Sequence, residues 1–181
     1  SMIYASLKTV ARWHHPLTPV CYLMFAAAGG LLATLALLAI LRLPITAALA
    51  QAAIVLMLSA WGVKLAWWRV AGMAPQQGSI ESATGLGALG AVRPLMPPHT
   101  EENYLQHEMG FVVARKHADK LRMIALLLGG GLPVVILVLA PASAGALAVA
   151  VLAHVAGMFV ERWLFFAEAK HVVTLYYGEA A

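Results

Sequence analysis

Three ionisable side chains, Lys64, His154 and Glu161, lie within or directly after long apolar stretches. Ionisable groups at membrane depth are costly, so they usually pair with one another or carry protons along a pathway. At 1.5 Å per helical residue, Lys64 and Glu161 would lie ~28 and ~26 Å from the outer membrane face, which is a shared depth. We therefore predict an ion pair between Lys64 and Glu161. The alternative is that the Lys64 ammonium group extends to the lipid headgroups.

His154 precedes Glu161 on the same face of the predicted helix. It would lie ~15 Å from the outer surface, near the middle of a membrane. Such a histidine either relays protons or stays neutral and hydrogen-bonds to a neighbouring carbonyl group. A b-type haem needs a second axial histidine at matching depth, and the other apolar stretches contain none, so we expect no haem.

The chain that carries these residues has the composition of a membrane protein. Of its 181 residues, 62% are hydrophobic and 11% are charged, whereas an average soluble domain has roughly 25% charged residues. Four uncharged stretches match the about 20 residues that cross a hydrocarbon core as a helix: 20–41, 45–63, 123–140 and 142–160. No period of two is present, which excludes a β-barrel. The predicted fold class is all-α, a polytopic membrane protein with four transmembrane helices in two hairpins and a long cytoplasmic loop.

The basic residues predict which helix ends face the cytoplasm. Of the twelve Lys and Arg residues, only Arg42 lies in a short connection between paired stretches. All the others lie on the opposite side, which the positive-inside rule assigns to the cytoplasm. Both termini of the chain would then be cytoplasmic. The net charge of +4 is explained by topology, and we expect no nucleic-acid partner.

The pattern divides the chain into segments. They are an interfacial segment (1–19), a transmembrane hairpin (20–71), a cytoplasmic loop with an amphipathic helix (72–118), a second transmembrane hairpin (119–166) and a C-terminal cytoplasmic tail (167–181). The amphipathic helix would begin at Thr100, and its apolar stripe would contain Leu105, Met109 and Val112. No signal peptide is visible before the first span.

Glycine and alanine positions predict how the spans pack. Gly129-Gly130-Gly131 and Pro133 should weaken or kink the third span, because glycine disfavours a helix and proline removes one of its hydrogen bonds. Such a break either lines a cavity or allows close packing. Small residues at helical spacing could allow the hairpins to pack: Ala26, Gly30 and Ala33 on the first span, and Ala146, Ala150, Ala153 and Gly157 on the fourth.

We expect no metal site within this chain. Cys21 is the only cysteine, and an iron–sulfur cluster or a structural zinc ion needs several ligands. The histidines outside the spans lack the spacing of metal ligands. Any such centre would therefore belong to a partner, and no catalytic machinery for soluble-enzyme chemistry is evident.

Three motifs carry a resemblance to a known family. The first is SMIYASLK at 1–8 with Arg12-Trp13. The second is PPHTEENYL at 97–105, with EMGF at 108–111 and ARKHA at 114–118. The third is ERWLFFAEA at 161–169, with His171 and YYG at 176–178. In this order they resemble the C-terminal half of the dimethyl sulfoxide reductase membrane-anchor subunit family, sulfite-dehydrogenase-type anchors included.

This resemblance implies a haem-free, non-catalytic anchor subunit of a molybdopterin oxidoreductase complex in the bacterial inner membrane. Its partners would be an iron–sulfur subunit and a molybdopterin catalytic subunit, which hold those cofactors. The complex would exchange electrons with menaquinone or ubiquinone. The family has about eight spans, so a half of roughly four helices would be absent from this chain. A sulfite-oxidising and an S-oxide-reducing complex could use the same anchor.

The resemblance and the predicted depths together give candidate site residues. Because a quinol site needs hydrogen-bonding groups and a proton path, quinone binding or proton relay is predicted for His154, Glu161, Lys64, His14 and Trp13. Contact with partner subunits is predicted for Arg12, His15, Arg115, Lys116 and Arg162. Aromatic residues at the inner ends of the spans are interpreted as a headgroup belt rather than a quinone-stacking wall: Trp61, Trp67, Trp68, Trp163, Phe165, Phe166, Tyr176 and Tyr177.

Two alternative functions stay open at this point. A proton-coupled transporter fragment would use Glu161 and His154 as its relay and the broken third span as a discontinuous helix. A cofactor-free membrane scaffold would need neither residue. Molybdenum and iron–sulfur absorbance that travel with the protein would indicate the anchor, whereas substrate uptake by the chain alone would indicate transport.

Overall fold

Four long helical spans make up the computed structural model, which describes residues 1–73, 79–93, 95, 112–169 and 172. The spans are α2 (Leu17–Ile40), α3 (Ala47–Gly72), a third made of α7 (Ala118–Leu126), η2 (Leu127–Gly131) and α8 (Leu132–Leu139), and α9 (Ala144–Ala167). Each is long and apolar enough to cross a membrane. No strand occurs in the described ranges, so the predicted fold class is confirmed.

The spans expose most of their apolar side chains. Only 28–33% of the residues in their most apolar windows are buried. Leu23, Leu152 and Phe159, for example, are 67%, 69% and 72% exposed. Apolar surface of this extent needs a solvent that is itself apolar, because water would oppose its exposure. The chain is therefore a multi-pass membrane protein whose outer surface faces lipid.

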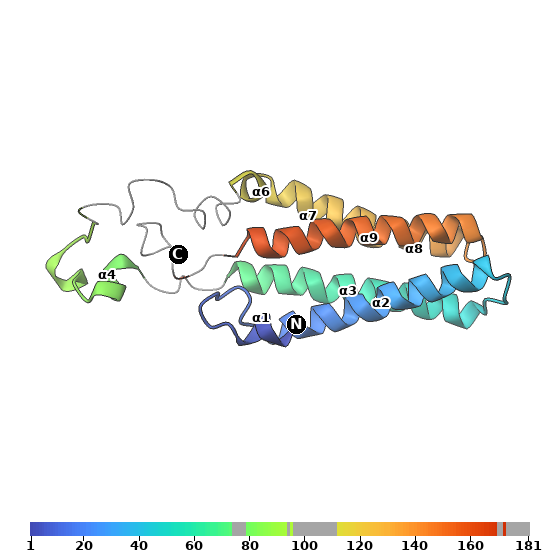
Figure 1. The fold of residues 1–181 in the computed structure, drawn as a ribbon, viewed down its shortest axis with the longest axis horizontal. Helices are drawn as coiled ribbons and strands as arrows, with labels where there is room; N and C mark the ends of the chain where they lie inside the picture. Colours follow the sequence, from blue (N-terminus) through green and yellow to red (C-terminus); the bar gives the residue numbers. More distant parts are fainter. Residues whose placement is uncertain (74–78, 94, 96–111, 170–171, 173–181) are drawn as a thin grey trace.

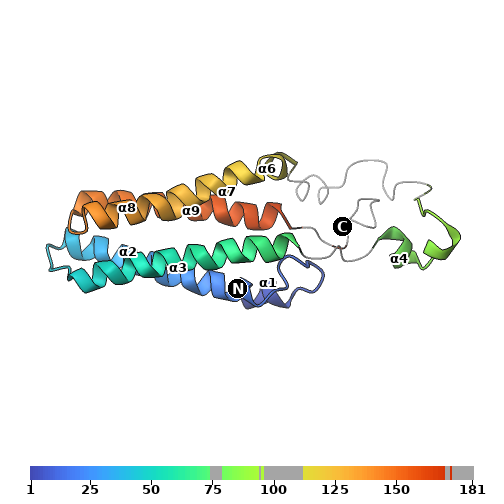
Figure 2. The ribbon, with the colours of Figure 1, turned by 180° about the vertical axis from the view of Figure 1, so that it is seen from behind.

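The two hairpins lie side by side, with the α2–α3 and α8–α9 connections at one end of the bundle (Figures 1 and 2). We call this the turn end. The other end, which we call the charged end, carries the N-terminus, α1 (Met2–Ser6) and α6 (Val112–Lys116). The short elements α4 (Ile80–Thr84) and η1 (Gly87–Leu89) lie beyond it. Arg42, which has a φ of 56°, is at the turn end and is thus separated from Arg115 and Lys116, as predicted.

The spans extend further toward the charged end than their uncharged stretches predicted. α3 continues from residue 63 to Gly72, and α9 continues from residue 160 to Ala167. α2 begins at Leu17 instead of residue 20, and the third span begins at Ala118 instead of residue 123. The additional turns hold charged and aromatic residues. They remain helical because, as shown below, these side chains contact partners on neighbouring elements.

At the turn end, α3 and α9 begin with side-chain caps. Thr46 accepts a hydrogen bond from the amide of Leu49, and Ser143 accepts one from the amide of Ala146. The first amides of a helix have no acceptor within it, so these caps stabilise both helix starts. The second helix of each hairpin therefore begins at a capped, well-defined residue.

The predicted break in the third span is η2, a π-helical turn that contains Gly129, Gly130 and Gly131. A Cβ atom on Gly157 of α9 would lie 2.3 Å from the backbone nitrogen of Gly129. A Cβ atom on Gly129 or Gly130 would lie 2.6 Å from the ring of Trp61 in α3. The glycines thus allow η2 to touch both α9 and α3. Of the two predicted roles for the break, close packing is the one observed.

The small residues predicted to mediate packing divide between the two spans. On α9, Ala150 and Gly157 are buried. On α2, Ala26, Gly30 and Ala33 are not buried, so that part of the prediction is wrong for contacts within the bundle. The buried face of α2 instead holds Phe25, Ala28, Leu32 and Leu35. The start of the predicted amphipathic helix, with Thr100, Leu105 and Met109, lies outside the described residues.

Candidate functional site

A buried group of charges joins α3 to α9 near the charged end. Lys64 of α3 forms an ion pair with Glu161 of α9, and Arg162 binds the second oxygen of the same carboxylate. The side chains of Lys64 and Glu161 are 1% and 0% exposed. This confirms the predicted pair, and it excludes the alternative in which Lys64 reaches outward to the headgroups. We call Lys64, Glu161 and Arg162 the charge cluster.

The charge cluster contains two cations and one anion, and aromatic faces accommodate the excess positive charge. Lys64 Nζ lies 3.7 Å from the ring centroid of Trp67. Arg162 Cζ lies 4.0 Å from the ring centroid of Tyr22 and 5.0 Å from that of Phe165. The negative face of an aromatic ring attracts a cation, and this attraction is stronger where water is excluded. Burial of an ion pair is costly because both charges lose their contacts with water. The aromatic rings offset part of this cost by attracting the two cations.

A chain of hydrogen bonds ties the N-terminal segment to the charge cluster. Trp67 Nε1 donates to Thr18 Oγ1 over 3.0 Å, and Thr18 Oγ1 donates to the carbonyl oxygen of Trp13 over 2.9 Å. Trp13 Nε1 in turn donates to the carbonyl oxygen of Phe165 over 3.0 Å. The rings of Trp13 and Phe165 are stacked, with centroids 5.2 Å apart. Trp13 is therefore fixed against α9 on both its polar and its apolar side.

Glu168, directly after α9, connects three parts of the chain. Its carboxylate accepts a hydrogen bond from Arg12 over 3.0 Å and forms a second ion pair with Arg122 of α7. Arg122 also pairs with Asp119 one turn away on α7. Burial lowers the pKa of the Arg12 guanidinium from its ordinary value, and the Glu168 charge partly offsets this. An arginine guanidinium is not deprotonated in proteins, so Arg12 binds Glu168 as a cation.

The residues predicted to contact partner subunits differ in whether their side chains already bind groups within the chain. Arg115 donates to the carbonyl oxygens of Ala167 and Ala169, over 2.8 and 3.1 Å, and so caps the end of α9. His15 Nδ1 accepts from the amide of Leu17 at the start of α2. Arg12 and Arg162 are held by carboxylates, as described above. Lys116 is exposed.

His154 lies nearer to the turn end than the charge cluster and contacts two other spans. Its Nδ1 is 2.6 Å from the carbonyl oxygen of Gly129 in η2. A carbonyl oxygen can only accept, so Nδ1 carries the proton. On its other side, Nε2 lies 2.9 Å from the position that a Cβ atom on Gly29 of α2 would occupy. The predicted hydrogen bond from His154 to a carbonyl group is confirmed.

The predicted quinone or proton-relay residues thus fall into three places. Trp13 and Lys64 both lie near Phe165, and Lys64 is paired with Glu161. His154 is separate from them, in the contact of α9 with α2 and η2. His14 is exposed, and its Nδ1 lies 2.6 Å from the carbonyl oxygen of Ala5.

Several aromatic residues predicted to form a headgroup belt have a different position in the structure. Trp163 and Phe166 are 44% and 38% exposed, so for them a headgroup belt stays a prediction. It is wrong for Trp61, Trp67, Trp68 and Phe165, which are buried. Spacing could have revealed this, because Trp67 and Trp68 follow Lys64, and Phe165 follows Glu161, at the interval that places side chains on one helix face. Tyr176 and Tyr177 lie outside the described residues.

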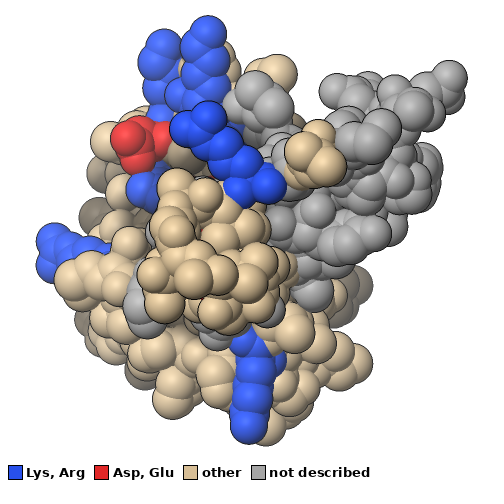
Figure 3. All heavy atoms as spheres, turned by 90° about the vertical axis from the view of Figure 1, so that its left-hand side faces the viewer, with Lys and Arg blue, Asp and Glu red and all other residues tan. Residues whose placement is uncertain are grey.

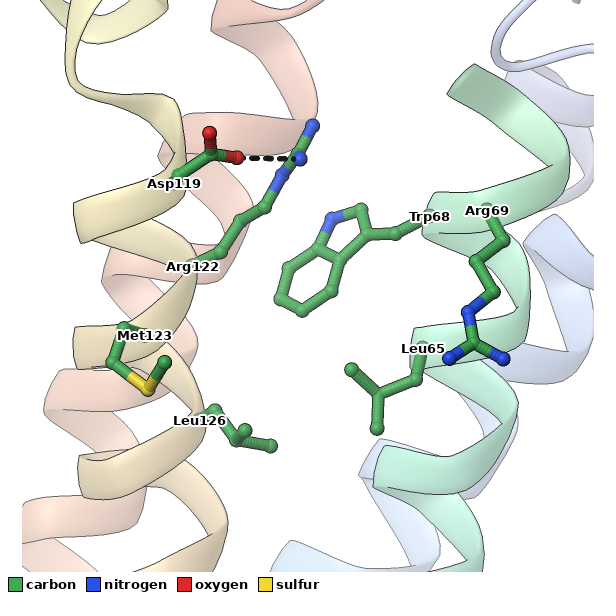
Figure 4. Close-up of a pocket in the computed structure, with 7 residues that line it drawn as sticks. All are labelled: Leu65, Trp68, Arg69, Asp119, Arg122, Met123 and Leu126. Atoms are coloured by element: carbon green, nitrogen blue, oxygen red, sulfur yellow. Dashed lines mark hydrogen bonds and ion pairs between the residues drawn. The ribbon is translucent and has the colours of Figure 1, made fainter. Parts of the chain in front are cut away.

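A groove opens between α3 and α7 at the charged end (Figure 4). Its volume is about 430 Å³, and it is lined by Leu65, Trp68, Arg69, Asp119, Arg122, Met123 and Leu126. Trp68 and Arg122 extend toward each other across it, with Arg122 Cζ 5.7 Å from the Trp68 ring centroid. Trp68 also contacts the charge cluster, since Lys64 Nζ lies 5.2 Å from its ring centroid.

Comparison with known proteins gives one similarity. The chain is 28% identical, over 183 aligned residues, to a protein of Allochromatium vinosum that is named as a subunit of sulfite dehydrogenase. The alignment covers 100% of this chain and 56% of the relative. The chain therefore spans about half the length of the curated relative it matches. No family model matches the chain, and no solved structure matches it.

Proposed function

We propose that this chain is a membrane-anchor subunit of a molybdopterin oxidoreductase complex in the bacterial inner membrane. The observation that carries the proposal is the similarity of the whole chain to a protein named as a sulfite dehydrogenase component. Four helices that can cross a membrane suit an anchor. Because an iron–sulfur cluster needs several cysteine ligands and the chain has only Cys21, the redox centres are assigned to an iron–sulfur subunit and a molybdopterin catalytic subunit.

The charged end is the proposed docking face for these partners. Seen along the bundle from this end, the charged side chains of the described surface are mainly basic (Figure 3). Lys8, Lys116 and Lys120 are exposed, whereas Arg42 is the only basic residue in the sequence of the two connections at the turn end. By the positive-inside rule the charged end would face the cytoplasm. Exposed cations there would attract an acidic partner surface and orient it.

Exchange of electrons with menaquinone or ubiquinone is proposed for the assembled complex. A quinone ring needs hydrogen-bonding groups in an apolar slot. Lys64 and Glu161 fit direct contact poorly, because both side chains are fully enclosed. Trp13 fits better, since it is only partly buried and stacks on Phe165 beside the charge cluster, and the neighbouring His14 is exposed. In this arrangement the excess positive charge of the cluster would favour negative charge on a nearby quinone oxygen.

The transporter alternative has less support. A relay between His154 and Glu161 would have to cross ~10 Å along α9, since they are two helical turns apart. Glu161 is held by two cations, and the Nδ1 proton of His154 is held by the Gly129 carbonyl group. Both groups have static bonding roles within the bundle. The break in the third span is filled by packing against Trp61 and Gly157.

Co-purification tests the proposal. The protein, tagged and extracted from its own membranes in mild detergent, should carry stoichiometric molybdenum and an iron–sulfur absorbance. We expect Lys116→Glu combined with Lys120→Glu to reduce both at least tenfold, because the partner would dock on this face. Arg42→Glu at the turn end is the matched control and should leave both unchanged. Metal-free protein that catalyses solute uptake in vesicles would refute the anchor function.

A further inference from the structure

The groove between α3 and α7 has a polarity gradient along the membrane normal. α3 runs toward the charged end, so Arg69 lies about one helical turn nearer to it than Leu65. α7 runs away from that end, so Asp119 and Arg122 come first and Leu126 lies deepest (Figure 4). The deep part of the groove is therefore apolar and its mouth is charged. Any ligand that fits both parts is an amphiphile with its polar head at the charged end.

Donor groups at the mouth are only partly used. Arg122 binds Asp119 and Glu168 through its terminal nitrogens, but its Nε is buried and has no hydrogen-bond partner in the part of the chain that the structure describes. Arg69 is exposed and forms no ion pair with the described residues. An anion at the mouth would meet the Arg122 guanidinium. Figure 4 shows the Arg69 side chain turned along α3 away from Arg122, but Arg69 is exposed, and an exposed side chain can rotate to bring its guanidinium to the same anion. Guanidinium groups match phosphate geometry well. Asp119 points to solvent, with its side chain 93% exposed, and its charge is offset by Arg122.

The sides of the groove are open to lipid. Leu65 is 42% exposed and Met123 is 55% exposed, so an acyl chain could lie against both without moving either helix. Trp68, which is 8% exposed, lines the groove between these two side chains and Arg122. Basic pockets between membrane helices are a known setting for anionic headgroups.

We propose that this groove binds one anionic phospholipid, whose phosphate group contacts Arg69 and Arg122 and whose acyl chain lies along Leu65, Met123 and Leu126. The site is specific for a lipid with net negative charge. It would be occupied whether or not partner subunits are bound, so it is independent of the proposed redox function. A bound lipid would also fill the space that separates α7 from α3 and so support the position of Arg122.

Native mass spectrometry of the purified, delipidated chain tests this proposal. Titration with phosphatidylglycerol should give one saturable adduct that forms at least fivefold more tightly than the adduct with phosphatidylcholine. Arg69→Gln should weaken the phosphatidylglycerol adduct about fivefold, as expected for one cation near a headgroup. Arg42→Gln at the turn end is the matched control and should have no effect. Met123→Trp, which narrows the groove without changing charge, should also remove the adduct.

Other outcomes would overturn the proposal. Equal affinity for phosphatidylcholine would show that the groove does not select anionic lipids. Equal competition by glycerol phosphate, which has the phosphate but no acyl chain, would show a simple anion site. Displacement of phosphatidylglycerol by a short-chain quinone analogue, with no loss on Arg69→Gln, would assign the groove to quinone. Because Arg69 is exposed and holds none of the described carboxylates, its variant should fold normally, which circular dichroism can verify.

Discussion

His154 Nδ1 donates a hydrogen bond to the carbonyl oxygen of Gly129 over 2.6 Å. In a regular α-helix this carbonyl group would accept from the amide of residue 133, which is proline and has no N–H. The imidazole of α9 thus supplies a donor that Pro133 cannot. A carbonyl group left unpaired away from water is costly, so this bond stabilises the contact between α9 and the third span.

Removal of the imidazole should destabilise the bundle in a way that depends on Pro133. We expect His154→Leu to lower the free energy of unfolding by about 1–3 kcal/mol, because Gly129 loses its donor. In a Pro133→Ala background the main chain can supply the missing N–H, so the same replacement should cost less than half as much. Denaturation in detergent micelles measures both values. The exposed His14→Leu serves as control, and equal costs in the two backgrounds would contradict this explanation.

Gly157 should tolerate no side chain. A Cβ atom there would lie 2.3 and 2.4 Å from the backbone nitrogen and Cα atoms of Gly129, so α9 and η2 would have to separate. We expect Gly157→Ala to lower the free energy of unfolding by about 2 kcal/mol or more, since overpacking at a backbone contact cannot relax through rotamers.

The control for this prediction is another glycine on a membrane helix. Gly30 and Gly145 have no atom within 4 Å of an added Cβ atom. Alanine at either position should leave stability unchanged or raise it slightly, because alanine favours the helix. A Gly157→Ala variant as stable as Gly30→Ala would show that α9 and η2 do not touch as described.

The charge cluster predicts how three variants rank in their loss of free energy of unfolding. Glu161→Gln leaves the buried Lys64 beside the partly exposed Arg162, with no anion between these two cations, whereas Lys64→Met leaves Glu161 paired with Arg162. The first should therefore cost more, and each single change should fall near the about 3–5 kcal/mol typical of breaking a buried pair. The double variant should recover part of the loss. Chemical denaturation gives all three values, and a smaller cost for Glu161→Gln than for Lys64→Met would argue against the observed two-to-one arrangement.

Glu168 should control the mobility of the N-terminal segment. Glu168→Gln removes the charge that holds Arg12, while Arg122 keeps Asp119 as a partner. We expect the endoprotease Lys-C to cut after the exposed Lys8 several times faster in this variant, because cleavage follows local opening. Asp119→Asn is the control: it removes an ion-pair partner of Arg122 but leaves the Arg12–Glu168 pair intact. Lys-C should cleave this variant at the same rate as the unchanged protein. Unchanged cleavage in Glu168→Gln would show that the segment is held by its aromatic contacts alone.

The sequence was sufficient to predict the four spans and the Lys64–Glu161 pair, since both depend on simple quantities. A helix rises a fixed distance per residue, and lipid leaves few positions for an unpaired charge. Contacts between distant segments were not predictable in this way. Glu168, for example, binds Arg12 and Arg122, which come from segments whose position depends on tertiary packing. Arg115 likewise caps α9, a contact that its place in the sequence did not indicate.

The sequence also did not indicate that the small residues predicted to pack on α2 face away from the other helices. Ala26, Gly30 and Ala33 have helical spacing, but so do Phe25, Ala28, Leu32 and Leu35, and hydrophobicity does not distinguish the faces of a helix that lies in lipid. The structure selects the second face, where Gly29 leaves room for His154. This requires the position of α9, which no local pattern on α2 contains.

The unequal charge of the two ends bears on how the protein enters its membrane. The α2–α3 connection carries a single cation, Arg42, and the α8–α9 connection carries none. Translocating either connection therefore requires moving at most one charge through the hydrocarbon layer. Translocating the other end would require moving the arginines and lysines of several segments at once. Each hairpin can thus insert as a pair of helices from the side on which it is synthesised, without export of a folded domain.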